Sequence, residues 1–288
     1  HSEVIMKLTT RGSTAAITIG STSAARRNVT IKNILIEQGS TNTSTGTIGV
    51  EFNGATRCSM SNVGIRLFRN EGLKYHASTA ASAVYGRFDR LNILNNRIGL
   101  SLAGSTAAST VVNDNAFYNC QIVNNAEVNL LVGQFASDNV FIAPDLSAGS
   151  GSTAAPRALV EVQSRGITLI TPTVEWSTGS TGMLASSTSA IFRLLSTGDS
   201  MGANNFTARH CQITDNFPGV LVQESTFGGV TYEVTISDDT VVGNPNTEVQ
   251  TNIPVLGGYV QSARETVQGA GGAGLLQNLL RDSQLFTS

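Results

Sequence analysis

Charged side chains are scarce in this sequence, so a carboxylate beside an aromatic residue is a candidate for chemistry. Lys+Arg is 18 and Asp+Glu is 20 in 288 residues, a charged share of 13% that is about half the usual value. Asp145 lies beside Leu146, Glu175 lies beside Val174, and the only tryptophan, Trp176, follows directly. Glycoside hydrolysis needs two carboxyl groups around the bond, and a flat indole ring can stack on a sugar. The pattern predicts Asp145 and Glu175 as a catalytic acid/base pair, with Trp176 as the stacking platform.

Other polar and aromatic residues are expected on the same face and are predicted to bind substrate. They are Tyr118, Arg209, His210 and Asp89. The alternative is that all of them are scattered solvated residues, with Trp176 buried at a subunit contact. Asp89 stands between two arginines, so it suits a sugar contact and an intersubunit ion pair equally well.

Metal, membrane and nucleic-acid chemistry are not expected. Cys58, Cys120 and Cys211 are widely spaced, and His76 and His210 lie far apart, so neither a metal site nor a disulfide framework is indicated. We therefore predict no metal and no cofactor. No run of 18 apolar residues occurs, so membrane insertion is not expected. The net charge of −2 supplies no basic stripe for a phosphate backbone, so no nucleic-acid partner is expected.

The elements that must position these residues repeat along the chain. An apolar residue is followed three positions later by a second, mostly apolar one, and two positions after that by a third. The eight triplets are Ile31, Ile34, Ile36; Met60, Val63, Ile65; Phe88, Leu91, Ile93; Phe117, Cys120, Ile122; Phe141, Pro144, Leu146; Leu169, Pro172, Val174; Ala208, Cys211, Ile213; and Ile236, Asp239, Val241. Their last members are separated by 29, 28, 29, 24, 28, 39 and 28 residues. Short alternating segments at 48–52, 98–102, 159–162, 191–194 and 220–222 predict a second strand in most repeats.

A unit of about 28 residues with two or three strands indicates a parallel β-helix, in which each strand pairs with its counterpart one coil further on. The triplets are expected to face inward and to stack in one sheet. Coils are about 4.8 Å apart and a two-residue shift adds about 6.6 Å, so we expect roughly 8 Å between Asp145 and Glu175. Inverting glycosidases place their carboxyl groups roughly 6.5–9.5 Å apart. After the triplet strands, Asn95, Asn124 and Asp215 hold equivalent positions and predict an amide ladder.

A β-sandwich is the alternative architecture. It needs antiparallel hairpins with tight turns, and no clear Asn-Gly or Asp-Gly turn joins alternating strands in this sequence. A sandwich also gives no reason for the fixed interval. Within the β-helix we predict two segments: residues 1–253 form the β-helix domain, and residues 254–288 form a short irregular or helical tail that leads towards a missing module.

The chain resembles the right-handed β-helices of the pectate-lyase-like superfamily. The likeness rests on the coils and on the Cys-Gln-Ile motif at residues 120–122 and 211–213, with alternating strands such as 98–102 and 219–222. The low charge and the Ser/Thr/Ala/Gly-rich surface resemble bacteriophage tailspike proteins. Residues 277–286 look like the opening strand of carbohydrate-binding modules of phage tails. The resemblance implies a right-handed, single-stranded parallel β-helix that forms a homotrimer and binds bacterial surface polysaccharide.

The resemblance transfers no catalytic motif, because the Asp, His and Arg/Lys motifs of polygalacturonases and the calcium cluster of pectate lyases are not recognisable. We therefore predict a tailspike-like receptor-binding protein of the virion tail that recognises a capsule, exopolysaccharide or O-antigen. We also expect depolymerase activity, either by hydrolysis or by a lyase reaction. The alternatives are a non-catalytic structural or adhesive segment of a tail fibre and a secreted polysaccharide lyase or epimerase.

Overall fold

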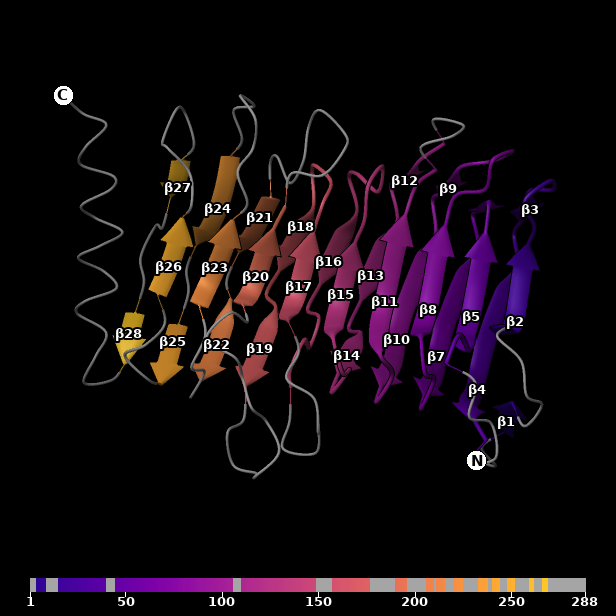
Figure 1. Cartoon of the computed structure of the whole chain (residues 1–288), viewed down its shortest axis with the longest axis horizontal. Helices are drawn as coiled ribbons and strands as arrows, with labels where there is room; N and C mark the ends of the chain where they lie inside the picture. Colours follow the sequence, from indigo (N-terminus) through magenta and orange to yellow (C-terminus); the bar gives the residue numbers. More distant parts are fainter. Residues whose placement is uncertain are drawn as a thin grey trace.

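The chain folds as a parallel β-solenoid. A computed structural model describes residues 4–8, 15–39, 45–105, 110–148, 157–176, 190–195, 206–209, 211–215, 220–224, 233–237, 240–243, 248–251, 259–261 and 266–268. Figure 1 shows the strands side by side along the long axis in the order of the sequence. Every pairing between named strands is parallel, so the predicted parallel β-helix is confirmed and the β-sandwich is excluded for the described residues.

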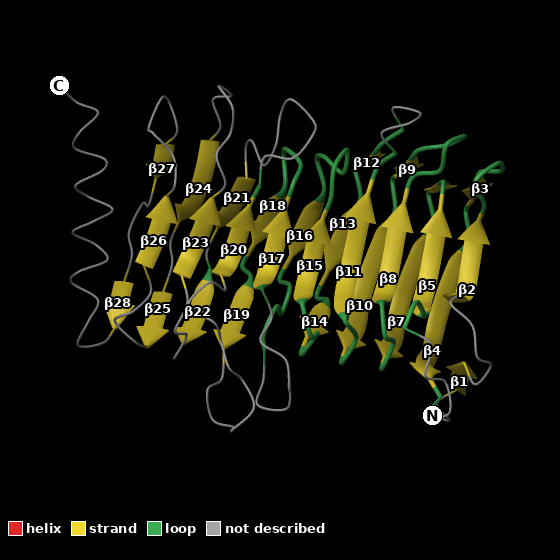
Figure 2. Ribbon diagram, in the orientation of Figure 1, coloured by secondary structure: helices red, strands yellow, loops and turns green. Residues whose placement is uncertain are grey.

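Two long sheets run along the solenoid. Figure 2 shows that the described residues form strands and the loops that connect them. The first sheet contains, in pairing order, β1 (Val4–Leu8), β4 (Thr30–Gln38), β7 (Ser59–Arg66), β10 (Arg87–Leu94), β13 (Ala116–Tyr118), β16 (Val140–Ile142), β18 (Thr168–Ile170), β21 (Phe206–Arg209), β24 (Glu233–Ser237) and β27 (Tyr259–Gln261). The second contains β2 (Ala15–Gly20), β5 (Ile48–Asn53), β8 (Glu71–His76), β11 (Ile98–Ala103), β15 (Val128–Val132), β17 (Ala158–Val162), β20 (Ala190–Leu194), β23 (Val220–Glu224) and β26 (Glu248–Thr251).

Shorter strands complete the coils. β14 (Gln121–Val123) pairs with β10, and β19 (Thr173–Trp176), β22 (Gln212–Asp215), β25 (Thr240–Gly243) and β28 (Thr266–Gln268) form a further row. β3 (Arg26–Arg27) pairs with β6 (Ala55–Thr56), and β9 (Ala83–Val84) pairs with β12 (Val112–Asn113). β27 and β28 continue the rows beyond residue 254, whereas the rest of the predicted tail lies outside the described residues. The predicted boundary at residue 253 stays a prediction.

A left-handed residue inside the first-sheet strand explains the spacing of the triplets. In a regular strand, residues three apart point to opposite faces. Met60 and Val63 are nevertheless both buried, because Asn62 between them has a φ of 55°. The extra residue acts as a bulge and resets the alternation, so that both apolar side chains face the core. The same left-handed position recurs at Asn33, Arg90, Asn119, Ala143 and Thr171.

The first residues of the triplets form one inward column, as predicted. Met60 pairs with Phe88, Phe88 with Phe117, and Phe117 with Phe141. The rings of Phe88 and Phe117 stack with centroids 4.5 Å apart, and those of Phe117 and Phe141 with centroids 4.6 Å apart. These separations match the spacing of neighbouring strands. A continuous aromatic stack therefore packs the middle coils.

Buried asparagine side chains bond the backbone groups of the turns, but these asparagines stand one residue later than the sequence predicted. Asn125 accepts bonds at its Oδ1 from the backbone N and the Nδ2 of Asn96, both at 3.0 Å. Asn129 accepts the corresponding two bonds from Asn125 at 3.1 and 2.9 Å. The predicted positions Asn95 and Asn124 instead take φ values of 56° and 57°, and this turn directs the next side chain inward. The ladder at Asn95 and Asn124 was therefore wrong by one position.

All three cysteines are buried and free of disulfides. Burial raises the pKa of the Cys120 thiol to about 11 and also raises that of Cys58, so both stay protonated at neutral pH. These two thiols are therefore inert core groups.

Candidate functional site

Outward side chains of the first sheet form columns that run along the solenoid. One column lies before the left-handed residue and two lie after it. The first column contains Lys32, Ser61, Asp89, Tyr118, Ile142, Ile170 and Arg209. The second contains Ile5, Leu35, Gly64, Asn92, Gln121, Asp145 and Thr173. The third begins with Lys7, Glu37, Arg66, Leu94 and Val123.

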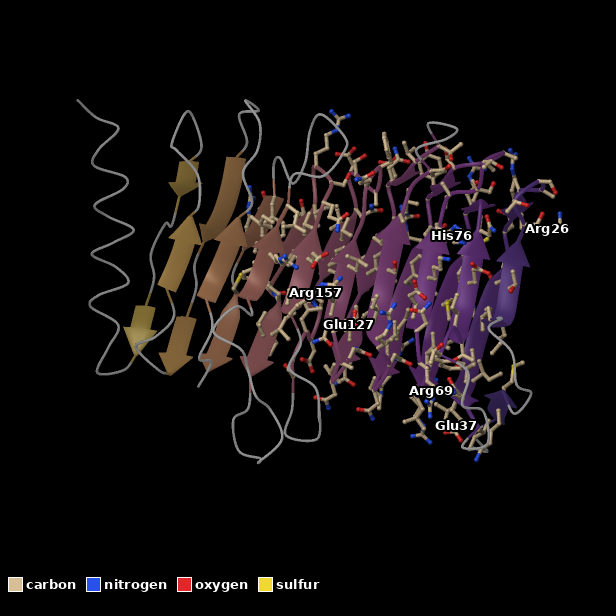
Figure 3. The ribbon with its side chains drawn as sticks, in the orientation of Figure 1. Arg26, Glu37, Arg69, His76, Glu127 and Arg157 are labelled. Atoms are coloured by element: carbon tan, nitrogen blue, oxygen red, sulfur yellow. The ribbon has the colours of Figure 1, made fainter. Side chains whose placement is uncertain are left out.

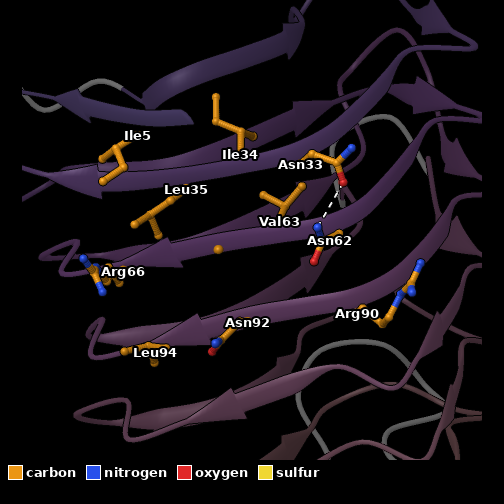
Figure 4. Close-up of a pocket in the computed structure, with 11 residues that line it drawn as sticks. Ile5, Asn33, Ile34, Leu35, Asn62, Val63, Arg66, Arg90, Asn92 and Leu94 are labelled. Carbon is orange, nitrogen blue, oxygen red and sulfur yellow. Dashed lines mark hydrogen bonds between the residues drawn. The ribbon is translucent and has the colours of Figure 1, made fainter. Parts of the chain in front are cut away.

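A groove of about 810 Å³ lies over the N-terminal part of these columns, across β1, β4, β7 and β10. Figure 4 shows its lining, with the Asn33–Asn62 pair near one end and Arg66 at the other. Asn62 donates its Nδ2 to Asn33 Oδ1 at 3.0 Å, and the exposed Asn92 adds a further amide. The volume of the groove falls in the range of small-molecule sites. Amides beside apolar surface can bind the hydroxyls and the ring faces of a sugar.

The floor of the groove depends on Gly64. A side chain there would meet Leu35 Cδ1 at 2.7 Å, so the missing Cβ lets the Leu35 side chain lie over the glycine. Leu35 is 8% exposed, whereas Ile5 at the edge is 47% exposed. The hollow therefore arises where a glycine separates larger residues of the second column.

A three-residue ion cluster borders the groove. Glu37, which Figure 3 labels near the N-terminal end, bonds Lys7 Nζ at 2.9 Å through Oε1. Its Oε2 accepts from Arg66 Nε and Arg66 Nη2, each at 2.8 Å. These bonds to Lys7 and Arg66 lower the pKa of Glu37. The cluster fixes the Arg66 guanidinium at the groove and leaves its Nη1 turned away from Glu37.

The pH dependence of stability is expected to report this cluster. Because the pKa of Glu37 is lower in the folded chain than in the unfolded one, its stabilising effect is complete above the ordinary glutamate pKa of about 4.3 and is lost as the pH falls through the folded pKa. We expect the melting-temperature difference between wild type and Glu37→Gln to shrink from pH 6 to pH 3. Thermal unfolding across this range measures it, and parallel curves would contradict the assignment.

Arg90 lines the opposite end of the groove, and its partner Asp89 lies beside it, outside the lining. Arg90 Nε donates to Asp89 Oδ2 at 2.9 Å, and the Arg90 side chain is 65% exposed. Asp89 pairs in register with Tyr118 of the next coil, so two predicted substrate-binding residues are neighbours in the first column. Arg209 stands three coils beyond Tyr118 in that column and is exposed.

Asp145 lies in the second column, two coils beyond Asn92 of the groove. Its Oδ1 accepts bonds from the Ser147 backbone N at 3.1 Å and from Ser147 Oγ at 2.5 Å. The backbone of Asp145 forms an isolated parallel β-bridge with Thr173, which stands two residues before Glu175 in β19. The backbone of Glu175 therefore lies one coil away from Asp145 and two residues further along the strand.

The remaining predicted residues are placed only in part. Glu175 pairs with Thr214 and Trp176 with Asp215, which fixes their strand positions, while their side chains lie outside the described set. His210 lies outside the described residues. The catalytic pairing of Asp145 and Glu175 therefore stays a prediction.

A second charged cluster lies on the outside of the second sheet. Figure 3 labels two of its members, Glu127 and Arg157. Arg157 Nη1 lies 3.0 Å from Glu127 Oε2. Glu161 is only 2% exposed and accepts from Arg157 Nε at 2.8 Å and Arg193 Nη1 at 3.2 Å. Arg97 adds a bond to Glu127 at 3.0 Å. The carboxylates of Glu127 and Glu161 are ion-paired with arginines of neighbouring coils, so this cluster stabilises the contact between those coils.

Sequence reasoning missed the groove. The triplet pattern singled out carboxylates and aromatic residues, whereas the groove is lined by amides, two arginines and a glycine. A signal was present in the recurrence of Asn33, Asn62 and Asn119 after the first triplet residue. Among the residues that the structure describes, no group of His, Cys, Asp and Glu is placed to hold a metal ion, and no helix is long and apolar enough to cross a membrane.

Comparisons with known proteins give one distant likeness. No family model matches the sequence, and no curated protein matches it. The crystal structure of the tailspike protein gp49 from Pseudomonas phage LKA1 is similar with 10% sequence identity and a TM-score of 0.37. The match covers 92% of this chain and 49% of that one, so the chain spans about half the length of that protein. A likeness this distant says nothing of a shared activity.

Proposed function

We propose that this parallel β-helix is the receptor-binding part of a tailspike-like protein and that its outer face binds a bacterial surface polysaccharide. The groove over β1, β4, β7 and β10 carries the proposal. It combines amides, arginines and an apolar floor in about 810 Å³ on a rigid sheet. A long polymer can lie across successive coils, because equivalent positions repeat at each strand spacing.

The assembly and location follow as parts of the same proposal. Tyr118, Ile142 and Ile170 form a half-buried apolar run in the first column. Such a run, parallel to the solenoid axis, suits a contact between copies packed side by side. We infer a homotrimer in a virion tail, and light scattering that gives a monomer mass at all concentrations would count against it.

Filling the groove is expected to abolish glycan binding. In Gly64→Phe the new ring displaces the Leu35 side chain and occupies the floor, so affinity should fall at least ten-fold. The measurement is biolayer interferometry of the 288-residue chain against capsular polysaccharides and O-antigens purified from a panel of bacteria. Thr168→Phe places the same ring on the outside of β18, away from the groove, and should leave binding unchanged.

Two results would contradict the proposal. The first is binding of no glycan in the panel by the wild-type chain. The second is equal loss of affinity in Gly64→Phe and Thr168→Phe. Circular dichroism of both variants shows whether the solenoid is intact.

Depolymerisation is the second candidate function, and the register of Asp145 favours it. Asp145 bridges Thr173, so Glu175 lies one coil away and two residues along. At standard strand dimensions this offset amounts to roughly 8 Å, which leaves room for a water molecule between two carboxyl groups. A non-catalytic adhesive segment and a secreted lyase or epimerase are the alternatives that a test of cleavage would separate.

A further inference from the structure

Charge is unevenly distributed along the solenoid. Residues 1–97 contain twelve Lys and Arg against five Asp and Glu, a net charge of +7, and the remaining residues contain six against fifteen, a net charge of −9. Because the described strands stack in sequence order, the basic residues of the first strands lie at the N-terminal end of the solenoid (Figure 1). The small overall charge of −2 therefore hides a basic N-terminal end.

Part of this basic charge lies on the strands that carry the groove. β1, β4, β7 and β10 together carry five Lys and Arg and two acidic residues. The four strands β13, β14, β16 and β18, which follow along the first sheet, carry no charged residue. Among the described residues that line the groove there is no carboxylate, whereas there are two arginines.

Both groove arginines keep donors free for a ligand. Arg90 uses Nε for Asp89, and its two terminal amino groups have no partner among the described residues. Arg66 uses Nε and Nη2 for Glu37, and its Nη1 likewise has none in the described part of the chain. Arg90 can therefore present its paired terminal groups to the two oxygens of a carboxylate, whereas Arg66 offers the single donor Nη1.

The two arginines stand at opposite ends of the groove (Figure 4). Arg66 pairs with Leu94, four residues after Arg90, so the two backbone positions are roughly 14 Å apart at standard strand dimensions. One small acid cannot span that distance. A polymer that carries a negative charge at intervals can contact both arginines, with its uncharged part over Gly64 and Asn92.

We infer that the groove selects an acidic polysaccharide, one whose repeating unit bears a carboxylate, and that Arg66 and Arg90 bind those carboxylates. The inference rests on the proposed function and adds the chemical class of the glycan. A nucleic acid fits less well, because single strands are held by aromatic stacking and the described lining of the groove contains no aromatic residue.

The test uses glycans of the panel that carry carboxylates, each beside its carboxyl-reduced form, which has the same backbone without the charge. The wild-type chain should bind the reduced form at least ten-fold more weakly. Arg66→Gln combined with Arg90→Asn should reduce affinity for the acidic form to a similar degree and should change affinity for the reduced form far less. Asparagine occupies the equivalent left-handed position in the two preceding coils, so Arg90→Asn preserves the backbone. Arg27→Gln removes one exposed charge from the same end outside the groove and should have little effect.

The outcomes separate the inference from the function on which it rests. If no glycan binds, both are wrong. If acidic and reduced forms bind equally, or only neutral glycans bind, the inference is wrong and glycan binding stands. A loss in Arg27→Gln equal to that of the double variant would overturn the groove assignment in favour of general charge attraction. Binding of a 20-nucleotide single strand as tight as that of the acidic glycan would overturn the choice of ligand.

Discussion

Phe117→Ala is expected to destabilise the solenoid by about 3–5 kcal/mol, the cost of removing a buried aromatic ring. Phe117 is 1% exposed and stacks between Phe88 and Phe141, so its loss opens a cavity inside the column. In a solenoid each coil is stabilised by its two neighbours, so the cavity weakens two coil interfaces together. Urea unfolding followed by circular dichroism measures the change.

Tyr118→Ala is the matched control, because Tyr118 is the next residue and faces outward from the same strand. We expect it to cost no more than about 1 kcal/mol, as for a partly exposed side chain. Equal shifts in the urea midpoint for the two variants would show that the aromatic column does not dominate packing. A larger effect of Tyr118→Ala would instead support the subunit contact proposed for the first column.

Glu175→Gln is expected to reduce depolymerisation about 100-fold or more while leaving polysaccharide binding nearly intact. A glutamine keeps the size of the side chain and cannot exchange a proton, and proton transfer from a positioned carboxyl group contributes a factor of this order. Release of new reducing ends from the glycan that binds best measures the rate. Asp145→Asn should act in the same direction.

Glu127→Gln is the control, because Glu127 belongs to the ion cluster on the second sheet. It should leave the cleavage rate unchanged. Full activity in Glu175→Gln would remove the pair from consideration. Absence of reducing ends with the wild-type chain would favour the non-catalytic adhesive segment.

The spacing of apolar residues was enough to predict the solenoid and the register of its first sheet. Ile31, Met60, Phe88 and Phe117 were aligned from their spacing, and the structure pairs them in that order. The reason is physical. Parallel stacking places equivalent residues of successive coils in one inward column, so every coil must repeat the same apolar pattern to fill it.

The positions of the polar groups could not be predicted in this way, because they depend on turn conformations and on neighbours from other coils. The left-handed turn at Asn95 directs Asn96 inward, a one-residue change that apolar spacing does not encode. The prediction placed the site at carboxylates, whereas the groove forms where Gly64 stands between larger residues of neighbouring coils. Neighbours 28 or 29 residues apart create both the hollow and the paired Asn33 and Asn62.

The charge of the chain likewise has one aspect that a count gives and one that depends on the fold. From the net charge of −2 we expected no basic stripe, but a sum carries no positions and does not show the excess of Lys and Arg in residues 1–97. A globular fold brings distant segments together and mixes their charges. A solenoid keeps sequence order as spatial order, so the basic first third remains a basic end and places Arg66 and Arg90 together in one groove.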